Sequence, residues 1–246
     1  MTSFRPDLFV GRTVLVTGGT SGIGEGCARV FRALGADVLA TGATEAERGR
    51  AEEADGNEGI RFACLDVRDG AAIAALVEEL PRLDVLVNAA GTIRRDAEHD
   101  PAVFAEVVDI NLNGTMRTAS AARPLLARTG GSVVNVASML TFFGGPRVPG
   151  YSASKGGIGQ LTKSLAAAWA PDGIRVNAVA PGWIATPLTQ ALQDDPVRSA
   201  PILARTPMDR WGTPAEVADC AVFLASPAAR FVTGAILAVD GGYLTL

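Results

Sequence analysis

The stretch "TVLVTGGTSGIG", residues 13–24, decides the fold because an apolar run passes directly into a glycine-rich turn. The run "TVLVT" (13–17) is β-branched and apolar, as expected of a strand that is covered on both faces of a sheet. After the turn, "GCARVFRAL" (26–34) has the spacing of a helix. The stretch therefore predicts a strand, a tight turn and a helix, which together open a βαβ unit.

The same alternation continues to the end of the chain. Further strands are predicted at 37–41, 60–65, 85–89, 132–137, 174–180 and 235–240, with helical patterns between them, for example at 70–80 and 158–170. This order indicates an α/β fold of the Rossmann type, a doubly wound parallel sheet of about seven strands with helices on both faces. Residues 1–246 are predicted to form a single domain, in which the long segment 183–213 is an insertion that forms a substrate lid.

The composition argues against several classes of function. A net charge of −4 does not suit a nucleic-acid partner, because phosphate binding needs a basic surface. The sequence holds neither an apolar run that could span a membrane nor the apolar segment of a signal peptide. Three widely spaced cysteines and a single histidine, His99, argue against a disulfide framework, a metal site and a Ser-His-Asp hydrolase. We therefore expect a cytoplasmic protein that acts on a small molecule.

The glycines of the first turn have the spacing of a dinucleotide-binding loop. Gly18 permits the tight turn out of the strand, Gly22 lets a pyrophosphate approach the backbone, and Gly24 lets the following helix pack closely. Because these glycines follow a strand and open a helix, we expect a nucleotide here rather than a purely structural turn.

The end of the second strand bears on the choice between NAD and NADP. No acidic residue stands at the strand end itself, and no cation is placed to hold a 2′-phosphate; the residues concerned are Ser21, Gly42, Ala43, Glu45, Glu47, Arg48 and Arg50. NAD is favoured, with NADP open, because an unpaired phosphate is harder to hold than a hydroxyl without a partner. Asp66 is either an acceptor for the adenine amino group or the N-cap of the helix near residue 70.

The pair Tyr151 and Lys155, in "YSASK", predicts acid–base chemistry. Four residues apart at the start of a helix, both side chains leave the same face. An ammonium about 4 Å from the phenol, worth roughly 4 kcal/mol, would lower the pKa of Tyr151 from about 10 towards neutrality. Such a phenol can exchange a proton with an alcohol or a carbonyl, and Ser138, at the end of the fifth strand, could hydrogen-bond the reacting oxygen.

Taken together, these motifs resemble the short-chain dehydrogenase/reductase family. The resemblance covers nearly the whole chain: TGGTSGIG at 17–24, NAAG at 88–91, Asn111, Ser138, YSASK at 151–155, PG at 181–182 and VDGGYL at 239–244. It implies that Tyr151 is the general acid/base, that Lys155 lowers its pKa and holds the nicotinamide ribose, that Ser138 orients the substrate oxygen, and that Asn111 holds a water in a proton relay. Ala89 departs from the pattern, which commonly has asparagine there.

The resemblance also implies the remaining cofactor contacts and a homotetramer. The predicted cofactor-binding residues are Gly18, Thr20, Ser21, Gly22, Ile23, Gly24, Gly42, Asp66, Val67, Asn88, Ala89, Ala90, Gly91, Tyr151, Lys155, Pro181, Gly182, Ile184 and Thr186.

Some local strings look like a narrower group within that family. "GTIRR" (91–95), "ASMLTFFGGPRVPGYSASK" (137–155) and "RWG" (210–212) are similar to 2-deoxy-D-gluconate 3-dehydrogenases and gluconate 5-dehydrogenases. Arg94, Arg95 and Arg147 are candidate anchors for a sugar-acid carboxylate, because arginine binds carboxylates in a bidentate way. The alternatives are a 3-oxoacyl-carrier-protein reductase, an enzyme of simple secondary alcohols and ketones, and a nucleotide-sensing scaffold without turnover.

Overall fold

The central element is one parallel sheet. The computed structural model describes residues 4–246, and within them seven strands lie in the order β3-β2-β1-β4-β5-β6-β7. The strands are β1 (Thr13–Thr17), β2 (Asp37–Gly42), β3 (Arg61–Cys64), β4 (Val85–Asn88), β5 (Ser132–Val136), β6 (Arg175–Pro181) and β7 (Ile236–Val239). The predicted doubly wound fold is confirmed, and the strand order reverses between β1 and β4, where such sheets open a crevice.

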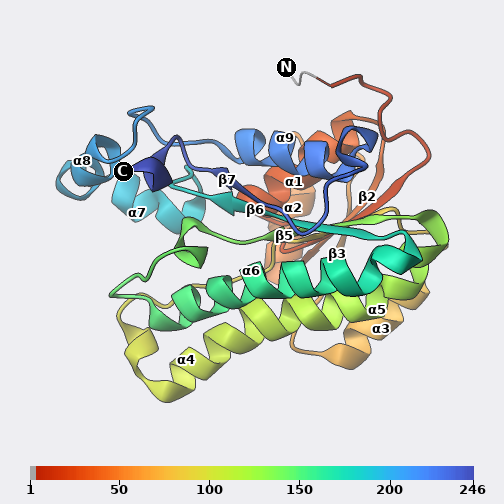
Figure 1. Ribbon diagram of the computed structural model, residues 1–246, viewed down its shortest axis with the longest axis horizontal. Helices are drawn as coiled ribbons and strands as arrows, with labels where there is room; N and C mark the ends of the chain where they lie inside the picture. The colour runs from red at the N-terminus through yellow and green to blue at the C-terminus, as the bar shows by residue number, and fades with distance from the viewer. Residues whose placement is uncertain (1–3) are drawn as a thin grey trace.

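Helices cover both faces of the sheet, as Figure 1 shows, with α1 and α9 above it and α4, α5 and α6 below it. The helices are α1 (Gly22–Ala33), α2 (Glu45–Glu53), α3 (Gly70–Glu78), α4 (Pro101–Val108), α5 (Gly114–Thr129), α6 (Pro149–Trp169), α7 (Gln190–Gln193), α8 (Pro196–Ala204) and α9 (Pro214–Ala225). α1 begins at Gly22, directly after the glycine turn, and Tyr151 lies in the first turn of α6, which begins at Pro149; both agree with the sequence, although the apolar helical spacing begins only at 26 and 158. The first turns, Gly-Ile-Gly-Glu in α1 and Pro-Gly-Tyr-Ser in α6, hold few apolar residues, so helical spacing does not mark them.

The two sides of β1 contribute to two separate cores. Val14 and Val16 pack with Phe31 of α1 on one face, and Leu15 packs with Leu126 of α5 on the other; all five side chains are fully buried. Burying such a side chain contributes about 1.5–3 kcal/mol. A strand of continuous apolar residues is therefore required to hold helices on both faces.

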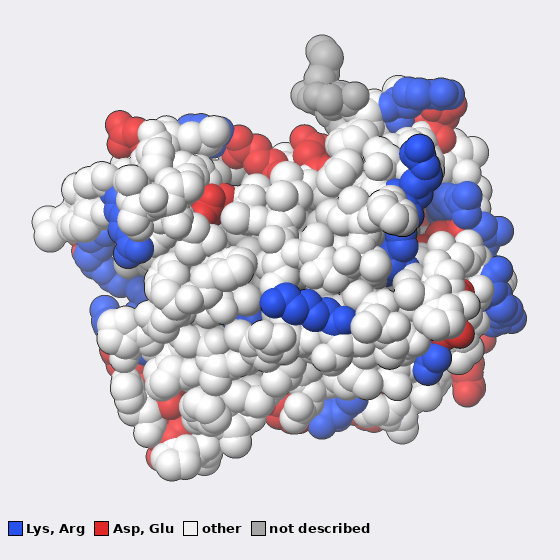
Figure 2. All heavy atoms as spheres, in the orientation of Figure 1, with Lys and Arg blue, Asp and Glu red and all other residues white. Residues whose placement is uncertain are grey.

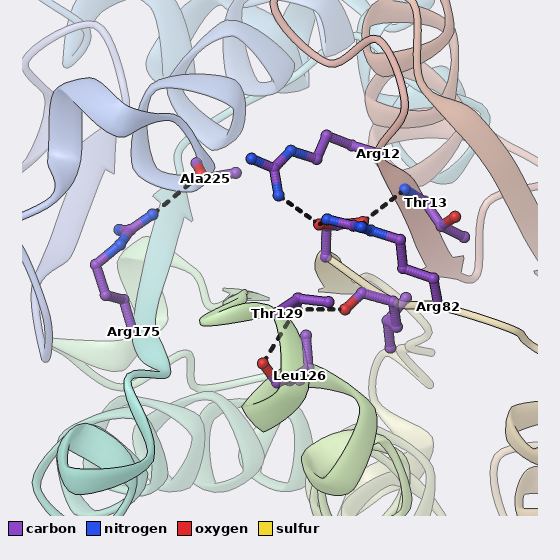
Figure 3. A network of polar contacts seen from close by, with 9 residues as sticks. Arg12, Thr13, Arg82, Leu126, Thr129, Arg175 and Ala225 are labelled. Carbon is purple, nitrogen blue, oxygen red and sulfur yellow. Dashed lines mark hydrogen bonds and ion pairs between the residues drawn. The ribbon is translucent and has the colours of Figure 1, made fainter.

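A polar cluster lies at the amino-terminal ends of the strands, where Arg12, Thr13 and Arg82 (Figure 3) surround Asp84. Its carboxylate accepts hydrogen bonds from Arg12 at 2.7 Å, from Arg82 at 2.6 and 2.7 Å, and from the backbone N–H of Thr13 at 3.0 Å. Nearby, Arg175 of β6 donates to backbone carbonyls at the end of α9. These contacts join strands at the edge opposite to the glycine turn.

The predicted lid, 183–213, leaves β6 and returns to α9. It contains α7 and α8, and its two ends meet in a single bridge between Ile184 and Gly212. The segment therefore forms a loop whose ends are held together at the carboxyl edge of the sheet. Among residues 4–246, no helix is long and apolar enough to cross a membrane.

Candidate functional site

A cavity of about 580 Å³ lies at the carboxyl edge of the sheet, where the strand order reverses. Most of the predicted cofactor residues line it: Gly18, Thr20, Ser21, Gly22, Ile23, Gly24, Gly42, Asp66, Val67, Ala89, Ala90, Gly91, Tyr151, Lys155 and Thr186. Four do not. Asn88 is buried and donates a hydrogen bond of 2.9 Å to Asn135, while Pro181 ends β6, Gly182 lies against Asp240, and Ile184 pairs with Gly212.

The glycine turn leaves bare backbone at the floor of the cavity. Gly18 has φ +65°, and a Cβ there would lie 2.6 Å from the backbone of Ala90. A Cβ on Gly24 would lie 2.1 Å from the carbonyl oxygen of Gly18. Because α1 begins at Gly22, its first N–H groups have no partner within the helix. A cradle of this kind fits the pyrophosphate of a dinucleotide.

The end of β2 brings a carboxylate to the cavity wall. Glu47 accepts the backbone N–H groups of Ala43 at 2.7 Å and Thr44 at 3.3 Å, and it lines the cavity beside Gly42 and Thr20. Sequence analysis did not select Glu47 as a site residue, although the T-x-x-E spacing of a capping box, at 44–47, marks its position.

Asp66 also lines the cavity, but it is already paired. Arg68 donates three side-chain hydrogen bonds of 2.6–3.0 Å to it, and this lowers the pKa of Asp66. The N-cap of α3 is Asp69, whose carboxylate accepts from Ala71 and Ala72. The N-cap alternative for Asp66 is therefore wrong.

Tyr151 and Lys155 lie together in the first turns of α6. The Nζ atom of Lys155 is 5.5 Å from the centre of the Tyr151 ring and donates a hydrogen bond of 2.6 Å to the carbonyl of Val136. Burial lowers the pKa of Lys155 to about 8. Ser138 lies next to them, buried, with its hydroxyl accepting from the N–H of Leu140 at 3.2 Å.

The expected lowering of the Tyr151 pKa is wrong for the chain alone. Burial is the largest influence and raises that pKa, because it disfavours the charged phenolate. A hydrogen bond with Ser138 acts in the other direction, and the negative charge of Glu98 raises the pKa further. The influence of Lys155 is limited since its ammonium is bonded to backbone rather than free to meet the phenol.

Asn111 connects two segments of the site by hydrogen bonds. It lies in a π-helical turn, Asp109–Asn113, between α4 and α5, and is fully buried. Its side chain accepts from the N–H of Thr92 at 2.8 Å and donates to the carbonyl of Thr92 and to Ser154, both at 3.0 Å. The side chain thus ties the loop after β4 to α6, and π-helical turns of this kind are frequent at functional sites.

The three candidate substrate arginines have different surroundings. Arg147 forms an ion pair with Asp96, so it is not a free cation. Arg94 lines the cavity and lies 3.9 Å from Glu106. Among residues 4–246, Arg95 has no ion-pair partner.

The surroundings of Arg95 carry further positive charge. Burial, and then the like charges of Arg147 and Arg198, lower its pKa. Arg198 belongs to α8 of the segment 183–213. The charge of Asp96 acts on Arg95 in the opposite direction but does not outweigh these effects. Of the three arginines, only Arg94 lines the cavity, and only Arg95 forms no ion pair among residues 4–246.

Comparison with known proteins adds a family. A family model described as Enoyl-(Acyl carrier protein) reductase matches residues 18–244. A 2-dehydro-3-deoxy-D-gluconate 5-dehydrogenase of Pseudoalteromonas atlantica is 44% identical and covers 95% of this chain and 96% of its own. A galactitol 2-dehydrogenase (L-tagatose-forming) of Cereibacter sphaeroides is 43% identical and covers 98% of this chain and 97% of its own.

A solved structure agrees with these relatives. The crystal structure of a gluconate 5-dehydrogenase from Burkholderia cenocepacia J2315, in complex with NADP and tartrate, is 33% identical with a TM-score of 0.89, and 98% of each chain is covered. The glycine turn, the sheet order and these matches point the same way. The chain belongs to the short-chain dehydrogenase/reductase family of NAD(P)-dependent oxidoreductases.

Proposed function

We propose that this oxidoreductase moves a hydride between NAD and a secondary hydroxyl of a gluconate-like sugar acid. The observation that carries the proposal is that one cavity contains the glycine cradle, the Tyr151–Lys155 pair and Arg94. A bound nicotinamide would supply the hydride acceptor there. The cradle would hold its pyrophosphate, and the side chains of α6 would face the substrate hydroxyl.

We assign proton transfer to Tyr151. In the direction of oxidation its phenolate takes the proton of the substrate hydroxyl, and in reduction the phenol returns it to the carbonyl oxygen. Ser138 donates a hydrogen bond to the same oxygen and holds it near the phenol. Lys155 would hold the ribose hydroxyls of a bound cofactor, and its positive charge beside the ring favours the phenolate form of Tyr151. Asn111 keeps the loop after β4 against α6, and we assign to it the water of a proton relay.

We assign the substrate carboxylate to the loop that holds Arg94, which lines the cavity, and above all to Arg95, the next residue, which forms no ion pair among residues 4–246. Burial and the like charges of Arg147 and Arg198 disfavour the charged guanidinium of Arg95, so a bound anion would stabilise it strongly. Because Arg198 comes from α8, an anion between it and Arg95 would also draw the segment 183–213 down as a lid. The names of the relatives support an acid as the substrate, since one is a 2-dehydro-3-deoxy-D-gluconate 5-dehydrogenase and another was solved in complex with NADP and tartrate.

We propose NAD rather than NADP as the preferred cofactor. The carboxylate of Glu47 supports this, because it lies at the end of β2, where the ribose 2′-hydroxyl of a bound adenosine would be. A carboxylate accepts a hydrogen bond from a hydroxyl but repels a 2′-phosphate. Nearby cations are already committed, Arg68 to Asp66 and Arg48 to Glu45.

We further propose a cytoplasmic homotetramer. The face shown in Figure 2, over α6 and β7, carries few charged side chains apart from one basic residue near its middle. Within residues 4–246, β7 is an edge strand, and Phe231 just before it is fully exposed. Such a surface suits contact with another copy, and the free thiols of Cys27, Cys64 and Cys220 suit a reducing compartment. Light scattering on the purified protein would give the number of subunits.

A panel of substrates with both cofactors tests the proposed function. Absorbance at 340 nm is followed with NAD⁺ or NADP⁺ over gluconate, 2-dehydro-3-deoxygluconate, galactitol and simple secondary alcohols, and with NADH or NADPH over acetoacetyl-carrier protein. We expect the highest kcat/KM for a sugar acid with the NAD pair. A higher value for galactitol or for the acyl-carrier substrate would overturn the substrate assignment.

A further inference from the structure

A buried carboxylate lies directly behind Tyr151. Glu98 is 1% exposed and sits in the short helix Ala97–His99 that follows the "GTIRR" loop. One carboxylate oxygen accepts the backbone N–H of Tyr151 at 2.7 Å, and the other accepts the backbone N–H of Arg94 at 2.7 Å. Within residues 4–246, no cation forms an ion pair with it.

Glu98 caps the start of α6, where no side chain of the helix itself accepts the free N–H groups. α6 begins at Pro149, and its N-cap residue Val148 provides no side-chain hydrogen bond. Tyr151 is the third residue of the helix, and its N–H is one of the groups that a helix cannot satisfy internally. A carboxylate at this position is favoured both by the charged hydrogen bond and by the dipole of the helix. The space is tight, because a Cβ on Gly150 would lie 3.3 Å from the same oxygen.

The two segments that Glu98 joins touch at further points. The N–H of Asp96 donates to the carbonyl of Arg147 at 2.8 Å, and the side chains of these two residues form an ion pair. His99 contacts the carbonyl of Pro146 at 3.1 Å. Residues 94–99, next to the proposed carboxylate anchors, are therefore fastened to residues 146–151, which lead to the proposed proton-transfer group. Glu98 is the buried member of this set of contacts.

We propose that Glu98 is a positioning residue that fixes the Tyr151 backbone relative to the Arg94–Arg95 loop. The distance between the phenol and the proposed substrate anchors is thereby held constant. The proposal rests on the assignment of proton transfer to Tyr151. It predicts two effects of Glu98: its hydrogen bonds raise kcat by holding Tyr151 in place, and its negative charge raises the pKa of the Tyr151 phenol.

The charge of Glu98 gives the proposal a measurable signature. It raises the pKa of Tyr151, after the larger effect of burial. The other charged or titratable groups around this helix start are Lys155 on α6, His99, the Arg94–Glu106 pair with α4, and the Arg147–Asp96 pair. The substitution Glu98→Gln removes one negative charge and leaves these groups unchanged. The pKa of Tyr151 should then fall.

Tyrosine absorbance tests this without any substrate, because the chain has only two tyrosines. In a Tyr243→Phe background, the rise of the tyrosinate band near 295 nm reports Tyr151 alone, and Tyr151→Phe in that background supplies the blank. We expect the midpoint of this titration to lie at lower pH with Glu98→Gln than with the parent. The matched control Glu78→Gln, on the exposed side of α3, should leave the midpoint where it is.

Kinetics on the best substrate of the panel then tests the geometry. We expect Glu98→Gln to lower kcat by about tenfold or more, with a higher KM for the acid and an unchanged Kd for NAD⁺. Glu98→Asp keeps the charge but cannot span both amides, so it should keep the parent midpoint and still lose kcat; it also serves if the Gln variant does not fold. A midpoint and kcat that both stay at the parent value in a folded Glu98 variant would overturn the proposal. The titration stands even if the panel assigns another substrate.

Discussion

The Nζ atom of Lys155 lies 5.5 Å from the centre of the Tyr151 ring and donates a hydrogen bond to the carbonyl oxygen of Val136, 2.6 Å away. The two side chains are therefore close together, but the hydrogen bond of the ammonium goes to the backbone and not to the phenol oxygen. Burial affects both members, raising the pKa of Tyr151 and lowering that of Lys155 to about 8. Any phenolate at neutral pH must then depend on groups that arrive with the cofactor and substrate.

Removing the phenol oxygen should separate chemistry from binding. For Tyr151→Phe we expect kcat to fall by about 10²–10⁴-fold, which is the usual contribution of a positioned acid or base. The Kd for NAD⁺, from fluorescence titration, should change little, because the phenyl ring remains in the cavity and neither the glycine cradle nor Lys155 is altered. Substantial turnover in this variant would show that another group transfers the proton.

Lys155 should give the stability of the protein a pH dependence above neutrality. Its pKa in the folded chain, about 8, lies below the ordinary 10.5, so the unfolded chain binds more protons between these values. Stability should therefore rise as the pH increases from about 8 to about 10.5, and the cost of the buried ammonium below that window is on the order of 3 kcal/mol.

Thermal unfolding of Lys155→Met checks this. Below about pH 8 the variant should be more stable than the parent, and the difference should shrink as the pH rises towards 10.5. Lys163→Met, exposed on the same helix, should follow the parent at every pH. If Lys155→Met and Lys163→Met have the same pH profile, the buried lysine is not the source of the effect.

The strands and the glycine turn were predictable because their signals are local. Each strand is a short apolar run, and a positive φ at Gly18 follows from a turn that begins directly after one. The capping box at 44–47 is equally local, so Glu47 could have been selected from the sequence. The start of α6 at Pro149 carries no apolar spacing, so the sequence places it only to within the turn that holds Tyr151.

The contacts that sequence analysis missed join residues far apart in the chain. Glu98 and Tyr151 are 53 positions apart, and Arg147 meets Asp96 across 51 positions. Such partners depend on where two loops meet at the edge of the sheet, and no spacing pattern records that. The pKa of Tyr151 was misjudged for the same reason, because burial and Glu98 are properties of the folded chain.

The preference for NAD should depend on the carboxylate of Glu47. With Glu47→Gln, we expect the Kd for NADP⁺ to fall by about tenfold, because a negative charge no longer faces the 2′-phosphate. The amide oxygen can still accept the N–H of Ala43, so the loop should keep its shape. Glu53→Gln, at the exposed end of α2, is the matched control and should change neither Kd. Calorimetric titration with both cofactors measures these Kd values. An equal change of the Kd for NADP⁺ in the two variants would contradict the role of Glu47.

Arg95 should discriminate acids from neutral polyols. We expect Arg95→Ala to raise the KM for a sugar acid by about tenfold, the loss of one charge-assisted contact, and to leave the KM for galactitol nearly unchanged. Arg147→Ala should affect both kinds of substrate, since Arg147 is paired with Asp96 and acts through the loop. Arg128→Ala, exposed near the end of α5, should affect neither. An unchanged KM for acids in Arg95→Ala would place the anchor elsewhere.

At the opposite edge of the sheet, Asp84 should control stability in acid. Burial raises the pKa of this carboxyl, but the hydrogen bonds from Arg82, Thr13 and Arg12 outweigh it, so the pKa lies below its ordinary 3.8. A lowered pKa means that the stabilisation is complete above about pH 4 and is lost as the pH falls through the folded value. Asp84→Asn should therefore cost on the order of 2 kcal/mol at pH 7, because two arginines and one backbone N–H lose a charged acceptor.

Urea unfolding at several pH values measures this. The difference between Asp84→Asn and the parent should be largest near neutrality and should close in strong acid, where the parent carboxyl is itself protonated. Asp37→Asn is the control: it pairs with Arg61 at 3.0 Å, but 58% of its side chain is exposed, so it should cost less than about 1 kcal/mol. Equal losses in the two variants, or a gap for Asp84→Asn that persists in acid, would mean that the amino-terminal edge does not depend on the charge of Asp84.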